Sequence, residues 1–356
     1  MMLDDLIQRP QYSLPQAKKE EVLLSELTRL CRRHRERSAE YARLTQMLFP
    51  GSPHNLAEIP YLPVNLFKEH LLSSVPESEV FKILQSSGTT GQRPSRIILD
   101  RETAQLQTLA LSRIMTTVLG PTRLPMILVE TSDLIRDRHQ FSARAAGTVG
   151  MMNFGRDYLY ALDSNLELLV PKLKNFLQRF AGGPFLIFGF TFLIWTRFCQ
   201  PLADAGIDLS NGILIHGGGW KKLQEQAVSA IDFRTALRKA MGLTRVYNFY
   251  GMVEQVGSVF LEGDDGYLYP PNFADVIVRD PYTFEEVPHG QTGVLEVLSA
   301  LPRSYPGHCL LTEDLGVVHA VDSSACGRLG KAFSVLGRIP QAELRGCSDV
   351  VAAKVG

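Results

Sequence analysis

A loop rich in glycine and hydroxyl side chains is the stretch of this sequence that most directly suggests chemistry. It lies between two apolar runs, Lys82–Gln85 and Arg96–Leu99. Glycine lets the backbone turn sharply and bring N–H groups close to an anion, and serine and threonine hydroxyls add further donors. The pattern predicts a strand, a loop and a strand around a polyphosphate, with the phosphate contacts made by Ser86, Ser87, Gly88, Thr89, Thr90 and Gly91.

This loop differs from the Walker A loop of many nucleotide-binding proteins. That motif needs Gly-Lys-Ser/Thr at its end, whereas Gly91 is followed by Gln92 and Arg93. The competing interpretation is the turn of a β-hairpin, which glycine and threonine also favour. A turn does not require an unbroken series of small or hydroxyl residues from Ser86 to Gly91, and we therefore favour phosphate binding.

Two later stretches place an acidic residue close to a predicted strand end. In Tyr250-Gly251-Met252-Val253-Glu254 the tyrosine ring can stack on a base, and the carboxylate of Glu254 can hold Mg²⁺ against phosphate. In Thr312-Glu313-Asp314 the aspartate can accept hydrogen bonds from both hydroxyls of a ribose. Each stretch also has a plain structural interpretation, because a Tyr-Gly turn with a surface glutamate and an aspartate in a turn are both common.

A histidine followed by three glycines is a further candidate. His216, Gly217, Gly218 and Gly219 come directly after a buried strand predicted over 212–215. This run is similar to the oxyanion loop of lipases, but Gly-x-Ser-x-Gly occurs nowhere in the chain, which excludes an α/β-hydrolase. We expect the glycines to let the backbone approach a ligand. His216 and Lys221 are candidates for contacting a carboxylate, or else structural residues.

Composition narrows the classes of partner. Lys plus Arg equals Asp plus Glu at 37 each, so there is no electrostatic reason to expect nucleic acid or an anionic membrane as a partner. The cysteines are odd in number and lack zinc-binding spacing, which predicts reduced thiols in the cytoplasm. The N-terminus has no secretory signal pattern. The most apolar stretch, Phe185–Trp195, is too short to span a bilayer and predicts a buried strand entering a helix.

The order of the predicted elements indicates an α/β fold with mixed sheets covered by helices. Apolar residues at helix spacing follow Asp100, a suitable N-cap, as far as Gly120. Further strands are predicted over 125–129, 185–188 and 212–215, and further helices over 166–180 and up to residue 241. Alternation of strand and helix is typical of a mostly parallel sheet that binds ligands at the carboxyl ends of its strands.

Four regions follow from this pattern. We expect a helical N-terminal segment over 1–80, because Val22, Leu23, Leu27 and Leu30 recur at helix spacing. The α/β core is expected over 81–260 and a β-rich subdomain over 261–336, where short β-branched runs alternate with turn residues. Residues 337–356 are expected to form a tail that carries Cys347.

Taken in order, these motifs resemble the adenylate-forming, or acyl-activating, superfamily. Ser86–Gly91 is similar to its phosphate loop, Tyr250–Glu254 to its Tyr-Gly-x-x-Glu motif and Thr312–Asp314 to its Thr-Gly-Asp motif, and Gly337-Arg338 with Arg345-Gly346 is similar to its hinge motif. Within that superfamily the chain resembles the acyl-protein synthetases of bacterial luminescence fatty-acid reductase complexes. This likeness rests on Ser86–Thr89, Gly217–Lys221, Ser304–Pro306 with Thr312–Gly316, and Arg345-Gly346-Cys347.

The resemblance implies a fold, an activity and a set of roles. The fold would be the large N-terminal domain of an acyl ligase without its full C-terminal domain. The activity would be ATP- and Mg²⁺-dependent activation of a fatty acid as acyl-AMP, transfer to Cys347 and delivery to a reductase. In this scheme the phosphate loop holds ATP, Tyr250 and Gly251 flank the adenine, and Glu254 supports Mg²⁺. Asp314 holds the ribose, and Arg338 contacts the nucleotide or the acyl carboxylate.

The sequence departs from the superfamily pattern at three places. Ser95 stands where the phosphate loop usually ends in lysine, and Glu313 replaces the glycine of Thr-Gly-Asp. The C-terminal domain that usually supplies a catalytic lysine is expected to be missing, so Lys221 becomes the candidate to replace that lysine. The aromatic residues of Phe185–Trp195, with Phe188 among them, are candidates to wall the pocket for the acyl group.

The identity of the thiol acceptor leaves alternatives open. Acyl-AMP is a reactive mixed anhydride, and a thiolate is the strongest nucleophile among side chains near neutral pH. Cys347 lies close to the C-terminus, on a segment able to swing between two sites, although without the family it would be read as a passive cysteine. The alternatives are a ligase that acylates coenzyme A or a carrier protein, and a non-catalytic subunit that binds an acyl chain or a nucleotide.

Overall fold

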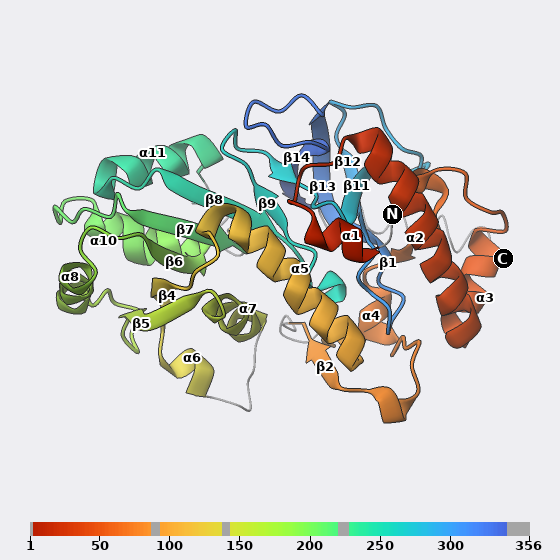
Figure 1. Ribbon diagram of the computed structural model, residues 1–356, viewed down its shortest axis with the longest axis horizontal. Coiled ribbons are helices and arrows are strands. Elements are labelled where there is room, and N and C mark those ends of the chain that lie inside the picture. Colours follow the sequence, from red (N-terminus) through yellow and green to blue (C-terminus); the bar gives the residue numbers. More distant parts are fainter. Residues whose placement is uncertain (1–2, 87–92, 137–142, 220–227, 340–356) are drawn as a thin grey trace. The chain divides into compact units, whose positions relative to one another are not determined.

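The computed structural model describes residues 3–86, 93–136, 143–219 and 228–339 (Figure 1). The chain divides into two compact units. The composite unit consists of Met1–Ile114 together with Gly251–Gly356, and the central unit of Met115–Tyr250.

The central unit is built on a parallel sheet, in the order β8-β7-β6-β4-β5 (Figure 1). Each neighbouring pair of these strands runs in the same direction. This arrangement confirms the predicted alternation of strand and helix and the strands expected near residues 125, 185 and 212. The strands are β4 (Leu124–Thr131), β5 (Gly155–Leu162), β6 (Phe185–Phe190), β7 (Gly212–Gly217) and β8 (Arg245–Tyr250).

Helices of the central unit bury the apolar strands between them. Ile127, Ile187 and Leu214 from three strands share one core with Phe198 and Leu237 from the helices. The helical elements are α6 (Asp133–Arg136), α7 (Ala143–Met152), α8 (Val170–Arg179), α9 (Thr191–Leu193), a π-helical turn over Ile194–Cys199, α10 (Gln200–Leu202) and α11 (Ala230–Met241). Phe185–Trp195 is therefore a buried strand entering a helix, as the sequence predicts.

One predicted helix begins later than expected. The apolar pattern places a helix over 166–180, but α8 begins at Val170. Leu166 has a left-handed backbone with φ of 62°, and Leu168 forms a β-bridge with Leu162. Pro171 lies in the first turn of α8, where proline fits because its missing N–H needs no partner. The prediction for residues 166–169 is wrong because local backbone pairing outweighs the apolar spacing.

The composite unit carries a β-rich sheet in the order β11-β12-β13-β14-β10-β9, which confirms the β-rich character expected after residue 260. Short β1 (Leu62–Pro63) pairs in parallel with β13. The other strands are β9 (Phe260–Glu262), β10 (Leu268–Tyr269), β11 (Ala274–Arg279), β12 (Gly293–Ser299), β13 (Cys309–Val321) and β14 (Lys331–Arg338).

A separate antiparallel pair in the same unit flanks the glycine-rich loop. It consists of β2 (Lys82–Gln85) and β3 (Arg96–Leu99), as predicted from the two apolar runs. After β3, the carboxylate of Asp100 accepts a hydrogen bond from the Thr103 backbone N–H at 2.7 Å and caps α5 (Arg101–Leu119). The predicted N-cap is thus confirmed.

Helices dominate the first part of the composite unit. Val22, Leu23, Leu27 and Leu30 form the buried face of α2, as their spacing predicts. The elements are α1 (Leu3–Gln8), α2 (Gln16–Arg37), α3 (Ala39–Leu48), α4 (Leu66–Glu69) and the 3₁₀ turns Leu56–Glu58 and Glu77–Glu79. In the part of the chain that the structure describes, no helix combines the length and the apolar character needed to cross a bilayer.

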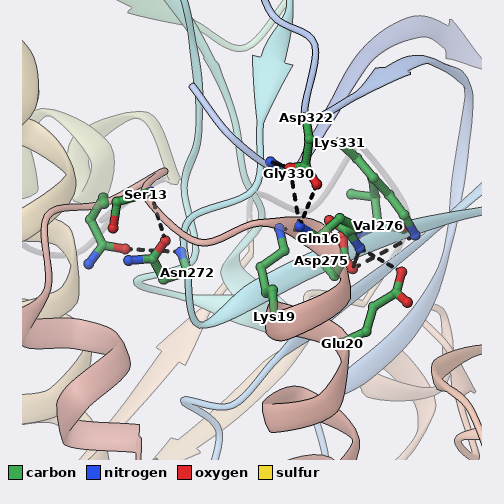
Figure 2. Close-up of polar contacts among 11 residues, drawn as sticks. Ser13, Gln16, Lys19, Glu20, Asn272, Asp275, Val276, Asp322, Gly330 and Lys331 are labelled. Atoms are coloured by element: carbon green, nitrogen blue, oxygen red, sulfur yellow. Dashed lines mark hydrogen bonds and ion pairs between the residues drawn. The ribbon is translucent and has the colours of Figure 1, made fainter. Parts of the chain in front are cut away.

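A buried charge cluster joins the start of α2 to the β-rich sheet (Figure 2). Asp275 is fully buried, and its two carboxylate oxygens lie 3.7 Å from the ammonium groups of Lys19 and Lys331, which are also buried. Gln16 donates to the same carboxylate at 2.6 Å. Burial raises the pKa of Asp275, but the two lysines and the hydrogen bonds outweigh it and bring the pKa below its ordinary value.

A second buried polar group ties α2 and α3 to the beginning of β13. His34 contacts the Ser74 hydroxyl at 2.7 Å and the Pro302 carbonyl at 3.2 Å. Its ring stacks on that of His308, with ring centroids 4.9 Å apart. Burial lowers the pKa of His34 to about 3 and that of His308 well below its ordinary value, so both imidazoles are neutral in the folded chain.

The charge cluster predicts a large loss of stability in Asp275→Asn. This change leaves Lys19 and Lys331 buried without their counter-ion, and breaking a buried pair in this way costs about 3–5 kcal/mol. Glu21→Gln, which breaks the exposed pair with Lys18, is the matched control and should not change stability measurably. Urea unfolding of both variants tests the prediction. Equal midpoints for the two variants would contradict it.

The two neutral histidines predict a loss of stability in mild acid. Unfolded histidine takes up a proton near pH 6.5, whereas the folded imidazoles stay neutral, so stability falls as pH drops through 6.5. Each histidine accounts for about 1.4 kcal/mol of stability lost between about pH 7.5 and about pH 5.5. Urea unfolding at both pH values should show a smaller pH effect in His308→Gln, and the exposed His289→Gln should keep the full effect. An equal loss of stability between the two pH values in the wild type and both variants would refute this account.

Candidate functional site

The two ends of the glycine-rich loop are held together in the composite unit. Ser95 donates its backbone N–H to the Ser86 hydroxyl at 2.8 Å, and Ser86 donates its own N–H to the Ser95 carbonyl at 3.1 Å. These bonds continue the pairing of β2 with β3, so the loop starts and ends at one place. Ser87, Gly88, Thr89, Thr90 and Gly91 lie outside the residues that the structure describes.

Glu254 lies beside that place, in the 3₁₀ turn Val253–Gln255, and is buried. The neighbouring amide of Gln255 fixes this turn by donating to the carbonyls of Val297 at 3.2 Å and Gly307 at 3.0 Å. Burial raises the pKa of Glu254, while the Ser95 hydroxyl and the positive charges of Lys68 and Arg338 act in the opposite direction. The net effect is a raised pKa, because burial outweighs these compensating groups.

Asp314 and Arg338 face each other across neighbouring strands of the same unit. They occupy paired positions of β13 and β14, and the Arg338 Nε atom lies 3.9 Å from an Asp314 carboxylate oxygen. The Thr312 hydroxyl accepts the Asp314 backbone N–H at 3.1 Å and donates to the Leu295 carbonyl at 2.8 Å. The guanidinium of Arg338 is 75% exposed, so it is available to a ligand.

The composite unit thus brings together residues that are far apart in the sequence. Ser86 pairs with Ser95, the Ser95 hydroxyl and the charge of Arg338 both lower the pKa of Glu254, and Arg338 pairs with Asp314. Together these residues supply the end of a loop, a buried carboxyl and an exposed cation. A carboxyl and a cation near the point where a glycine- and hydroxyl-rich sequence begins and ends are chemically suited to a nucleotide with its polyphosphate.

Tyr305 and Gly307 pack close to Glu254. The phenol of Tyr305 is fully buried; burial raises its pKa, and the nearby charge of Glu254 raises it further. A Cβ atom on Gly307 would lie 2.2 Å from the Tyr305 ring and 2.7 Å from the Glu254 carbonyl. Only glycine fits at this position without displacing the backbone that carries Glu254.

In the central unit, the remaining predicted residues lie at the carboxyl edge of the parallel sheet. Phe190, Gly217 and Tyr250 are the last residues of β6, β7 and β8, and the register pairs Phe190 with Gly217 and Gly217 with Phe249. The carboxyl ends of these three strands therefore meet, as expected for a ligand-binding edge.

His216 is buried at this edge and is neutral. Its Nδ1 atom lies 3.0 Å from the Thr191 hydroxyl, which donates its one proton to the Gly217 carbonyl at 3.1 Å. The hydroxyl must therefore accept from Nδ1–H, which leaves the lone pair of the ring on Nε2. Burial, aided by the charge of Arg234, lowers the pKa of His216 to about 3. His216 therefore adds no positive charge at this edge.

Aromatic rings surround the glycines that follow His216. A Cβ atom would lie 2.8 Å from the Phe249 ring at Gly217 and 2.7 Å from the Phe190 ring at Gly218, whereas at Gly219 it would meet nothing within 4 Å. Phe188 is buried and stacks on Phe249, with ring centroids 6.5 Å apart. Close aromatic packing is thus one reason for Gly217 and Gly218, whereas no described atom stands in the way of a side chain at Gly219.

Two of the predicted catalytic residues, Lys221 and Cys347, lie outside the residues that the structure describes. Within the described ranges, no group of three or more His, Cys, Asp or Glu side chains is arranged to hold a metal ion. A groove of about 520 Å³ runs along α5 and contains none of the predicted site residues. Because this groove is lined by no carboxylate, histidine, lysine or cysteine, we place the candidate site at the residues around Glu254 and at the edge of the central sheet.

Comparison with known proteins assigns the chain to a family. The acyl-protein synthetase family, LuxE, matches residues 2–356. The chain belongs to this family. Two relatives are long-chain-fatty-acid–luciferin-component ligases. The ligase of Vibrio harveyi is 25% identical over 337 residues, covering 88% of this chain and 83% of the relative. The ligase of Aliivibrio fischeri is 25% identical over 295 residues, covering 75% and 71%.

Solved structures confirm the fold class expected from the motifs. A 2-hydroxyisobutyryl-CoA ligase in complex with 2-HIB-AMP matches with a TM-score of 0.67 and 18% identity, over 92% of this chain and 69% of that chain. An open conformation of the same ligase with 2-HIB-AMP and CoA also gives a TM-score of 0.67, over 92% and 76%. The acyl-protein synthetase therefore has the α/β fold of the adenylate-forming ligases.

Several residues of the site were not predicted from the sequence. Tyr305, Gly307 and Gln255 reach Glu254 only through contacts between distant segments, and Lys68 comes from a short helix with no recognisable motif. The sequence signal that pointed nearest to them was the stretch Ser304–Pro306, which supports the family resemblance without indicating a role.

Two glycines near Glu254 give contrasting predictions. Gly307→Ala should destabilise the chain by about 1–3 kcal/mol, because the new Cβ atom overlaps the Tyr305 ring and the Glu254 carbonyl. Gly251→Ala, the matched control, meets only ordinary contacts at 3.6 Å and 3.8 Å and needs no left-handed backbone, so its unfolding midpoint should stay that of the wild type. Thermal unfolding of the two variants checks this prediction. A Gly307→Ala variant as stable as the wild type would contradict the close packing of Gly307 against Tyr305 and the Glu254 carbonyl.

Proposed function

We propose that this acyl-protein synthetase uses ATP to activate a long-chain fatty acid as acyl-AMP and then moves the acyl group to a thiol, most directly its own Cys347. The observation that carries the proposal is the gathering of Ser86, Glu254, Asp314 and Arg338 in the composite unit of a chain that belongs to the acyl-protein synthetase family. Both relatives are ligases for long-chain fatty acids, which supports an acid of this class as the substrate.

Each residue of this group has a role in the proposed nucleotide site. The donors of Ser86–Gly91 would hold the phosphates, Tyr250 and Gly251 would flank the adenine, and Asp314 would accept hydrogen bonds from the ribose. In the first step a carboxylate oxygen of the fatty acid forms a bond to the α-phosphorus. The bond between that phosphorus and the bridging oxygen breaks, and pyrophosphate leaves with the electron pair. Arg338, exposed at the end of β14, is placed to neutralise negative charge.

A magnesium ion fits this site through a single carboxylate. Mg²⁺ is usually held by one or two carboxylates together with the phosphates of the substrate, and it keeps several waters. Glu254 is the buried carboxyl beside the start and end of the loop; burial raises its pKa, and a bound cation would lower it by favouring the charged form. When bound, the ion would supply positive charge against the phosphate oxygens.

The acid-binding side of the reaction is proposed at the carboxyl edge of the central sheet. Half-buried Phe190 and Phe249 supply apolar surface there, and Phe188 packs against both from within the core. Neutral His216 is proposed as a polar contact of the acid, and Lys221 as the cation for its carboxylate. An apolar edge with few polar groups suits an acyl chain.

The cysteines in the described part of the chain support Cys347 as acceptor. Cys31, Cys199 and Cys309 are buried. Burial raises the pKa of Cys31 and of Cys199 to about 11 and that of Cys309 well above its ordinary value, so these thiols are poor nucleophiles at neutral pH. Cys326 is half-buried and becomes the natural comparison for Cys347. In the second step the Cys347 thiolate bonds to the acyl carbon, and AMP leaves with the electron pair of the broken anhydride bond.

Intact-protein mass spectrometry tests this proposal. After incubation with ATP, Mg²⁺ and a panel of fatty and aryl acids, the wild type and Cys326→Ser should each carry one hydroxylamine-labile acyl group, and Cys347→Ser should carry none. Pyrophosphate exchange into ATP should persist in all three proteins, because adenylation precedes the thiol step.

Other outcomes assign the chain differently. Pyrophosphate exchange without an acyl adduct on any of the three proteins would indicate that the acceptor thiol belongs to coenzyme A or to a carrier protein. An adduct that survives in Cys347→Ser would move it to another residue of this chain. If no acid supported pyrophosphate exchange, the chain would instead be a non-catalytic subunit that binds an acyl chain or a nucleotide.

A further inference from the structure

Strand β2 has a free edge in the part of the chain that the structure describes. Its one partner there is β3, in a separate two-stranded pair. The Ser86 N–H donates to the Ser95 carbonyl at 3.1 Å, so these two residues are a hydrogen-bonded pair of the ladder. Because such pairs alternate along antiparallel strands, the N–H and C=O groups of Ile83 and Gln85 point away from β3. Among the described residues, no other backbone group bonds to them.

Apolar side chains are exposed along this edge. Phe81, directly before β2, is 51% exposed and Ile83 is 48% exposed, whereas the apolar residues of β3 are buried. Residues two apart in a strand lie on the same face, so Phe81 and Ile83 share one face and Lys82 lies on the other. An unpaired edge with exposed apolar side chains is a template for pairing with another chain.

The face that carries Phe81 continues into the groove along α5. This groove of about 520 Å³ is lined by Phe81 and by one side of the helix, which includes Arg101, Ala104 and Leu109. Arg101 is the one charged side chain that lines the groove, and its guanidinium lies over the Phe81 ring, 4.8 Å from the ring centroid. The groove therefore combines apolar surface with a cation held at one end.

Two exposed cations at this surface lack a carboxylate partner. Lys82 and Arg101 take part in none of the ion pairs found within the described ranges. Glu102, next to Arg101 in sequence, pairs with Arg303 instead. The acidic turn Glu77–Glu79 precedes β2 and is not part of the edge. The charges of the edge and the groove thus favour a partner that carries carboxylates.

We propose that the free edge of β2 binds an extended, acidic segment of a partner protein, which adds to β2 and β3 as a third strand. The segment alternates apolar and acidic residues. Its backbone bonds to Ile83 and Gln85, and its apolar side chains cover Phe81 and Ile83. Its carboxylates face Lys82 across the pair and Arg101 at the end of the groove. This interaction goes beyond the function proposed above and does not depend on it.

The unpaired backbone groups favour a protein segment over a small amphipathic acid. A fatty acid also has a carboxylate and an apolar chain, and it could contact Arg101 and Phe81. It has no donors and acceptors spaced to pair with Ile83 and Gln85, however, whereas another strand has them at the same spacing as β2. A strand therefore uses both parts of the surface.

A labelled peptide in which valine and glutamate alternate is the probe for this site. Fluorescence anisotropy with the full chain, in the absence of ATP, should show saturable binding that weakens as salt is added. A peptide with lysine in place of glutamate should not bind. A valine–glutamate peptide with N-methylated valines should not bind either, because it cannot donate its valine N–H groups to the edge. Hydrogen exchange should show the amides of Ile83 and Gln85 slowed by the first peptide alone.

Variants of the chain test the charges and the edge separately. The double change Lys82→Gln with Arg101→Gln should weaken binding of the peptide about tenfold, the effect of losing two exposed ion pairs. Lys172→Gln with Lys174→Gln, at two exposed lysines of α8, is the matched control and should bind like the wild type. Ile83→Pro removes a donor from the free edge but no bond to β3, and should weaken binding about fivefold. Thermal unfolding shows whether each variant is folded.

Four results would overturn the proposal. The first is the absence of saturable binding, and the second is equal binding of the glutamate and lysine peptides. The third is bound peptide that leaves the exchange of Ile83 and Gln85 unchanged, a result that does not depend on any variant. The fourth is a dimer in sedimentation that Ile83→Pro dissociates, which would assign the edge to a second copy of this chain. Displacement of the peptide by a fatty acid that leaves those two amides unprotected would assign the groove to an acyl chain instead.

Discussion

A buried carboxyl group at Glu254 is the constraint on which the composite unit depends. Burying a carboxylate is unfavourable unless donors and positive charges compensate it. The chain meets this requirement with residues from separate segments: the Ser95 hydroxyl, the charges of Lys68 and Arg338, and the rigid support of Gln255. Burial still prevails, and the pKa of Glu254 is raised above its ordinary value.

In the central unit, aromatic side chains and glycines are packed together at one edge of the parallel sheet. Parallel strands bring Phe190, Gly217 and Tyr250 to one edge. The glycines there let the backbone lie against the rings of Phe249 and Phe190, which larger residues would push away. The Thr191 hydroxyl lies within hydrogen-bond distance of both the His216 ring and the Gly217 carbonyl, so this buried imidazole has a polar partner within the unit.

The sequence predicts the local elements well because their signals are local. The apolar runs on either side of the glycine-rich loop, the Asp100 cap and the strand leading into His216 are found where their patterns place them. The helix over 166–180 fails at its start because Leu166 takes a left-handed backbone, and Pro171 was the signal for the later start. Tyr305 and Gly307 escape prediction because their importance comes only from contacts with Glu254, which is distant in sequence.

Ionic groups and aromatic side chains are concentrated in different units of the chain. At the described edge of the central unit, burial keeps His216 neutral, and aromatic rings form much of the surface. The composite unit carries the carboxyl of Glu254, the pair of Asp314 and Arg338, and Lys68. Adenylation joins a fatty acid, largely apolar, to a nucleotide with several negative charges. A chain that concentrates ionic groups in one unit and apolar rings at the sheet edge of the other has the two chemical surfaces that these substrates require.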